Sequence, residues 1–130
     1  MIDKTKYWLD LADDDLSVAK ILLDGKKPLH TGFFCHLIVE KALKAMVASV
    51  TSEIPPKIHN LISLSERAEI FDDLSESQRK LLNELNPFNI EARYPEHKER
   101  VAQTLTAETT ARLFKETEEF LSWIKQKLEK

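Results

Sequence analysis

The chain has 130 residues, of which 42% are hydrophobic and 32% are charged, and it contains 2 Gly, 5 Pro and 1 Cys. This length predicts a single domain over residues 1–130, and the scarcity of Gly beside abundant Leu, Ala, Glu and Lys predicts an all-α fold. A formal net charge of -3 excludes a general nucleic-acid coat, which needs a basic surface. With no signal peptide, no membrane-spanning segment and a lone cysteine, Cys35, we expect a cytoplasmic protein that has no membrane partner.

A first helix is predicted from Asp3 to Asp24, because apolar residues recur there at steps of three and four. Gly25 is expected to end this helix, since glycine adopts the left-handed conformation without a Cβ clash. Pro28 follows shortly and prevents continuation. A second helix is therefore expected to start soon after this turn.

The most apolar stretch, Thr31 to Ser49, is expected to be the central helix, because it is apolar over most of its circumference. Its narrow polar seam consists of His36, Glu40 and Lys44, which stack along one line at steps of four. The seam has two leading interpretations, an ion pair between Glu40 and Lys44 or a polar contact across a dimer. A metal shared by His36 and Glu40 is less supported, since no zinc-ligand spacing is present. We predict a homodimer, because three or four neighbouring helices are expected to be too few to cover so much apolar surface.

A short third helix is predicted after an extended break at Pro55 and Pro56. It should run from about Lys57 to Ala68. His59 lies in its opening turn, where we expect the ring to hydrogen-bond a neighbouring element rather than to act in catalysis.

The last two helices carry recognisable start signals. Ser75 and Gln78 fit a capping box, and the helix that they open should end at about Arg93, because Pro95 disfavours helical geometry just before it. Thr106 is the expected N-cap of the final helix. The expected architecture is a five-helix antiparallel up-and-down bundle.

Several short motifs occur in an order that resembles the HEPN family, the higher eukaryotes and prokaryotes nucleotide-binding domain, over essentially the whole chain. The matching pieces are Trp8 with Leu11-Ala12, Phe34-Cys35-His36 followed by EKALKA at 40–45, His59-Asn60-Leu61, and Ala92-Arg93-Tyr94-Pro95. The resemblance implies a five-helix bundle that forms homodimers. It also implies a toxin–antitoxin or defence pair in which a minimal nucleotidyltransferase is the partner.

Many members of the wider family resemble metal-independent ribonucleases with an Arg and, four to six residues later, a His near the end of the fourth helix. The nearest counterparts here are Arg93 and His97, which are separated by only three residues. In such chemistry His97 would act as base or acid and Arg93 would hold the phosphate, with Tyr94, Lys98 and Arg100 in contact with RNA or nucleotide. The alternative is that Arg93 caps the helix and that His97 is solvated.

Two functions are open at this point. One is a HEPN-like protein that cleaves RNA without a metal and pairs with a minimal nucleotidyltransferase. The other is a non-catalytic module of the same fold that binds a nucleotide or a protein. Neither a cofactor nor a metal is expected, because the chain has no Gly-rich phosphate loop and no HExxH or CxxC motif.

Overall fold

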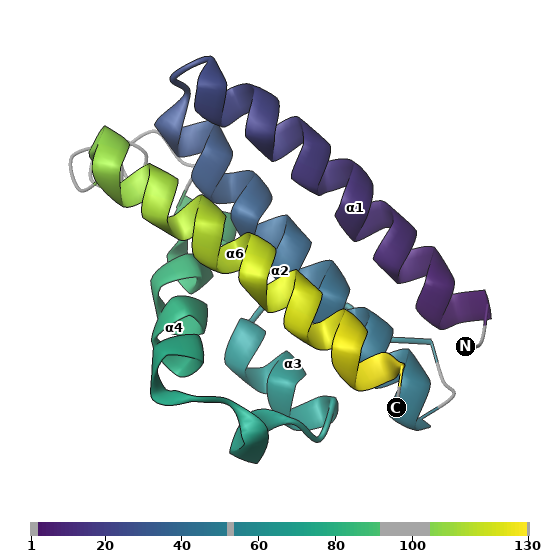
Figure 1. Cartoon of the computed structure of the whole chain (residues 1–130). Helices are drawn as coiled ribbons and strands as arrows, with labels where there is room; N and C mark the ends of the chain where they lie inside the picture. The colour runs from purple at the N-terminus through teal and green to yellow at the C-terminus, as the bar shows by residue number, and fades with distance from the viewer. Residues whose placement is uncertain (1–2, 52–53, 92–104, 130) are drawn as a thin grey trace.

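The structure is a computed structural model that describes residues 3–51, 54–91 and 105–129. Five α-helices and one 3-10 turn, with no strand, make up the secondary structure of this part: α1 (Asp3–Asp24), α2 (Pro28–Thr51), α3 (Leu61–Arg67), η1 (Phe71–Asp73), α4 (Glu76–Glu91) and α6 (Ala107–Leu128). The prediction of an all-α helical bundle is confirmed (Figure 1). No helix in the described ranges combines the length and the apolar character that crossing a membrane requires.

The central element of the bundle is α2, which contacts α1, α3, α4 and α6. Most of its residues are buried, including Cys35, and among its large apolar side chains Val50, 43% exposed at the end of the helix, is the most open. The prediction of a central apolar helix is therefore confirmed. The expectation that neighbouring helices cannot cover α2, from which a dimer was predicted, is wrong, because the chain's own helices cover it.

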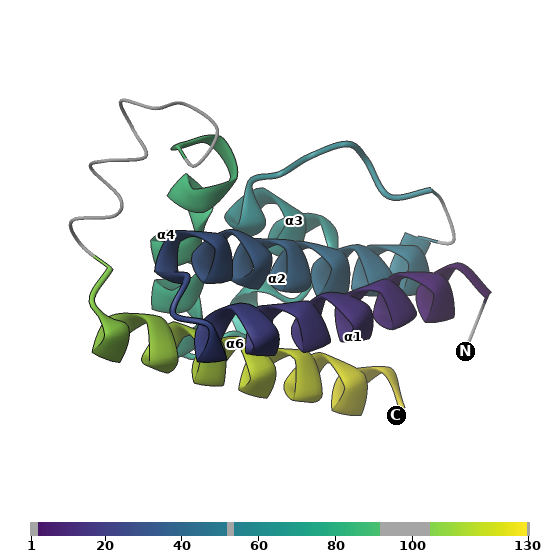
Figure 2. The same ribbon diagram turned by 90° about the horizontal axis from the view of Figure 1, so that it is seen from above.

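The long helices lie side by side along α2. α1 runs antiparallel to α2, whereas α6 runs in the same direction as α2, because α3 and α4 bring the chain back between them (Figure 1). Seen from above, α2 lies between α1 and α6 on one side and α3 on the other (Figure 2). Ion pairs link α1 to the two long helices beside it. Asp15 pairs with Lys41 of α2, and Asp13 pairs with Lys125 of α6.

The turn between α1 and α2 differs from the prediction by one residue. Gly25 continues the hydrogen-bond pattern of the α-helix, because its N–H donates to the Ile21 carbonyl at 2.9 Å. The left-handed residue is Lys26, with a φ of 59°, and the N–H of Lys27 then donates to the Leu22 carbonyl at 3.0 Å. This arrangement is a Schellman motif, which normally has glycine where this chain has Lys26.

The third helix begins later than predicted, at Leu61 rather than at Lys57. Asn60 caps it, because its Oδ1 accepts the Ser63 N–H at 3.0 Å. The cap fixes the start of the helix and leaves His59 just outside it.

The expected caps of the last two helices are confirmed. The Ser75 N–H donates to Gln78 Oε1 at 2.8 Å and the Gln78 N–H donates to Ser75 Oγ at 3.1 Å, which is a complete capping box. Thr106 Oγ accepts the Thr109 N–H at 3.0 Å. The predicted end of the fourth helix at Arg93 lies outside the described residues.

Candidate functional site

The residues that the sequence predicts for RNA cleavage and binding are Arg93, Tyr94, His97, Lys98 and Arg100. All of them lie outside the described residues. Their assignment stays a prediction.

The polar seam of α2 lies inside the chain. His36, Glu40 and Lys44 are 0%, 5% and 7% exposed. Their neighbours belong to the same chain, with the Lys44 ammonium 5.4 Å from the centre of the Trp8 ring of α1. Ionisable groups are rarely this buried unless they are paired, so the seam must be neutralised by contacts within the fold.

Glu40 is the hub of these contacts. Its Oε2 lies 3.0 Å from Lys44 Nζ, so the predicted i,i+4 ion pair is present. Both carboxylate oxygens lie 3.2 Å from Nδ1 of His59, which comes from the segment before α3. The expectation that His59 hydrogen-bonds a neighbouring element is therefore confirmed.

His36 completes the cluster as a neutral ring. Its Nε2–H donates to the His59 carbonyl oxygen at 3.0 Å, whereas Nδ1 has no hydrogen-bond partner among the described residues and lies 3.5 Å from Glu40 Oε1. Burial lowers the pKa of His36 to about 4, although the Glu40 carboxylate opposes this shift. At neutral pH the ring is uncharged, and its Nδ1 carries no proton to donate to the carboxylate.

Two asparagines hold His59 in place. Asn60 caps α3, and Asn86 of α4 accepts the Leu61 N–H through its Oδ1 at 2.8 Å. The chain around His59 is therefore anchored to α3 and α4 as well as to α2. Sequence reasoning named the HNL motif, but the pairing of His59 with Glu40 and the role of Asn86 need the tertiary structure.

This arrangement presents an imidazole to solvent. With Nδ1–H donating to Glu40, the opposite ring nitrogen, Nε2, has no partner among the described residues, and the side chain is 50% exposed. A carboxylate that fixes the tautomer of a histidine in this way leaves a lone pair available to accept a proton or a hydrogen bond. His59 and Glu40 can therefore act as a positioned proton acceptor or as a structural clamp.

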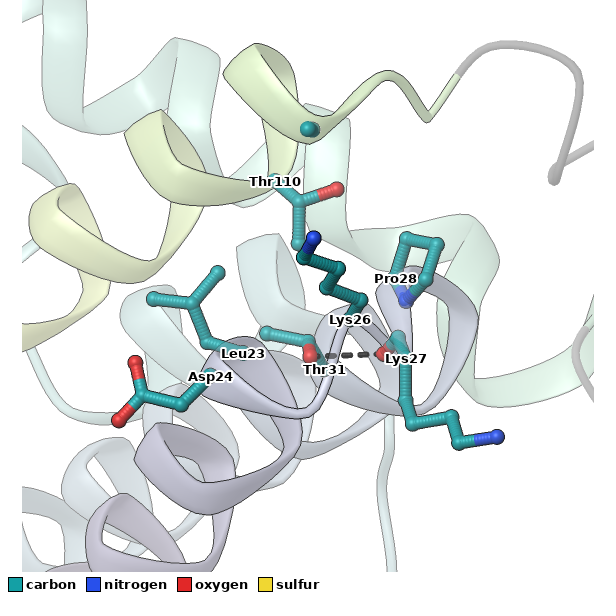
Figure 3. A pocket seen from close by; sticks show the side chains of 8 residues that line it. Leu23, Asp24, Lys26, Lys27, Pro28, Thr31 and Thr110 are labelled. Carbon is teal, nitrogen blue, oxygen red and sulfur yellow. Dashed lines mark hydrogen bonds between the residues drawn. The ribbon is translucent and has the colours of Figure 1, made fainter.

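A separate pocket of about 500 Å³ lies where the α1–α2 turn meets the start of α6 (Figure 3). Lys26 and Pro28 line it from the turn, and Ala107 and Thr110 line it from α6. Figure 3 shows Lys26 extending toward Thr110, whereas the side chain of Lys27 extends away from it. The sequence signal for this pocket is the pair of lysines that follows Gly25 at the end of the first helix, which was not among the predicted site residues.

Over the ranges 3–51, 54–91 and 105–129, no group of three or more His, Cys, Asp or Glu side chains lies together in a way that could hold a metal ion. In the cluster around Glu40, the carboxylate already accepts from Lys44 Nζ and from His59 Nδ1, whereas His36 Nδ1 stays unpaired within the described residues.

Comparison with known proteins adds two findings. The family model described as HEPN domain matches residues 5–128. The crystal structure of TT1696 from Thermus thermophilus is similar, with a TM-score of 0.82, 18% sequence identity, and coverage of 97% of this chain and 99% of that chain. At this identity the likeness shows the fold. No curated protein matches the sequence.

Proposed function

Because this chain belongs to the HEPN domain family, we propose that it acts on RNA as one protein of a toxin–antitoxin or defence pair, with a minimal nucleotidyltransferase as its partner. The observation that carries the proposal is the family match over residues 5–128, since membership supports a nucleotide-binding or RNase-like module. Arg93 and His97 supply the residue types that RNA cleavage needs.

Cleavage would proceed by attack of the RNA's own 2′-OH on the adjacent phosphorus, with loss of the 5′-oxygen. A base must take the 2′-OH proton, an acid must protonate the leaving oxygen, and a cation must offset the charge on the phosphate. His97 is proposed as base or acid and Arg93 as the cation, while Tyr94, Lys98 and Arg100 are proposed to contact the RNA. Two copies of the chain would supply both an acid and a base.

The dimer is part of this proposal. Support comes from α1, where Tyr7, Val18 and Ile21 are 58%, 38% and 70% exposed. Their spacing places them on one face of the helix, turned away from the core. A second copy that covered this face would remove their apolar surface from water.

The proposal is tested by incubating the purified protein with a mixed tRNA pool in EDTA. Products with 2′,3′-cyclic phosphate ends are expected, and they should disappear in His97→Ala and Arg93→Ala. The matched controls are His30→Ala and Arg67→Ala, which remove exposed residues of the same types in α2 and α3. Equal cleavage by all five proteins would indicate a contaminating nuclease and reject the assignment.

The second candidate is a non-catalytic HEPN module that binds a nucleotide or a protein. The observation that favours nucleotide binding is the pocket between the α1–α2 turn and α6, whose described lining residues include Lys26 and Lys27. Nucleotide binding without any RNA cleavage would select this candidate.

A further inference from the structure

The pocket at the α1–α2 turn carries an unbalanced positive charge. Among the described residues that line it, the one acidic residue is Asp24, which already pairs with Lys20 of α1 at 3.0 Å. Lys26 and Lys27 have no ion-pair partner among the described residues, and both are exposed. The net charge at the rim therefore favours an anionic ligand.

The backbone adds to this preference. α2 starts at Pro28 and α6 starts at Ala107, and both residues line the pocket. Pro28 has no N–H and the Thr109 N–H of α6 is already capped by Thr106 Oγ, but the positive end of each helix dipole still lies at the pocket. Two helix starts beside two lysines thus act with the same sign.

The wall of the pocket is suited to an uncharged ring. Leu23, Pro28 and Ala107 supply apolar surface. Thr31 Oγ donates to the Lys27 carbonyl at 2.7 Å and Thr110 Oγ donates to the Thr106 carbonyl at 2.8 Å, so both hydroxyl protons are used within the chain. The hydroxyl oxygens keep lone pairs that can accept from an amino or hydroxyl group of a ligand.

Building on the second candidate function, nucleotide binding, we infer that this pocket binds a nucleoside monophosphate, with its base against Leu23, Pro28 and Ala107 and its phosphate beside Lys26. The pocket volume of about 500 Å³ falls in the range of roughly 300–1,000 Å³ that is usual for small-molecule sites. Lys26 holds the left-handed position of the turn, with a φ of 59°, where glycine would be less strained. That position directs a cationic side chain across the pocket (Figure 3).

The test is a titration of the full chain with AMP, followed by ¹⁵N–¹H correlation spectra and calorimetry. Shifts are expected for amides of residues 23–27, 29–31 and 107–110. Adenosine and inorganic phosphate should each bind more weakly than AMP, because each supplies only part of the contacts. A short single-stranded RNA serves as a further probe, and tighter binding of RNA than of AMP at these amides would reject a free nucleotide as the ligand.

Lys26→Gly is the decisive variant. It removes the cation but relieves the backbone, so weaker binding cannot come from unfolding. We expect AMP affinity to fall about tenfold. Glu69→Gly is the matched control, because Glu69 holds the equivalent left-handed position after α3 with a φ of 62° and is not among the residues that line the pocket. Ala107→Trp, which fills the pocket at an exposed helix start, should also weaken binding.

The outcomes separate this inference from the proposed function. AMP binding that is unchanged in both Lys26→Gly and Ala107→Trp, or that shifts other amides, rejects this pocket while leaving a nucleotide-binding role intact. RNA cleavage without AMP binding supports the nuclease and rejects the pocket. Absence of both activities rejects the two together.

Discussion

Glu40 and His59 are joined through both carboxylate oxygens of the glutamate, each 3.2 Å from His59 Nδ1. Glu40 is 5% exposed in the middle of α2, whereas the His59 side chain is half exposed at the entrance of α3. The contact therefore links the centre of the bundle to a surface segment. It also determines which ring nitrogen of His59 faces solvent.

Replacing Glu40, which contacts both Lys44 and His59, should destabilise the protein. Glu40→Gln keeps the shape of the side chain but leaves the Lys44 ammonium, 7% exposed, without a charged partner. We expect the free energy of unfolding in urea to fall by about 2 kcal/mol or more. The control is Glu118→Gln, an exposed glutamate of α6, and equal stability of the two variants would show that the buried pair contributes little.

Stability should depend on pH through His36. Its pKa is about 4 in the folded chain and about 6.5 in an unfolded one, so between these values the unfolded chain binds the additional proton. The free energy of unfolding should therefore fall as the pH is lowered from about 6.5 to about 4, by roughly 3 kcal/mol from this group. At higher pH the ring is neutral in both states and contributes no pH dependence.

The measurement is a series of urea unfolding curves across this pH range for the parent and for His36→Gln. Glutamine can still donate to the His59 carbonyl but does not titrate. The parent should lose more stability on acidification than the variant. Glu40, Lys44 and His59 are present in both proteins, so the difference between them comes from His36. Parallel pH profiles would contradict the assignment.

The start of α2 packs so closely against α4 that a side chain larger than that of glycine would force a neighbour to shift. A Cβ at Gly32 would lie 2.5 Å from Cε1 of Phe88, a residue that is 5% exposed. Gly32→Ala should lower the unfolding free energy by about 1–3 kcal/mol through overpacking. Phe88→Leu should recover part of that loss when combined with Gly32→Ala, and a double-mutant cycle with additive effects would refute the contact.

Substitution by glycine should stabilise the two turns that contain a residue in the left-handed conformation. Lys26 and Glu69 have φ values of 59° and 62°, in the region that penalises a Cβ. Lys26→Gly and Glu69→Gly should each raise the unfolding free energy by up to about 1 kcal/mol, measured by thermal or urea unfolding. Destabilisation by both changes would mean that these side chains stabilise the fold more than the backbone strain costs.

Cys35 should be unreactive in the folded protein. Its side chain is fully buried, and burial raises the pKa of its thiol to about 11, although Thr117 opposes this shift. In mildly alkaline buffer Ellman's reagent should modify the native chain far more slowly than the chain in urea. Rapid modification of the native chain would show that the interior around α2 opens often.

Much of this fold follows from local sequence patterns. The limits of α1, the capping box at Ser75 and Gln78, and the cap at Thr106 were all predicted, because these features depend on residues within one or two helical turns. The predicted start of the third helix was wrong, since the cap at Asn60 outweighed the apolar periodicity that precedes it.

The line formed by His36, Glu40 and Lys44 also came from the sequence, because residues four apart share a helix face. What the sequence did not reveal is that this line is buried within one chain and that His59 reaches it. Helical periodicity shows that a face is polar or apolar, but not which segment covers it. That depends on how helices distant in sequence pack, and the same packing brings Lys26 beside Thr110 to form the pocket.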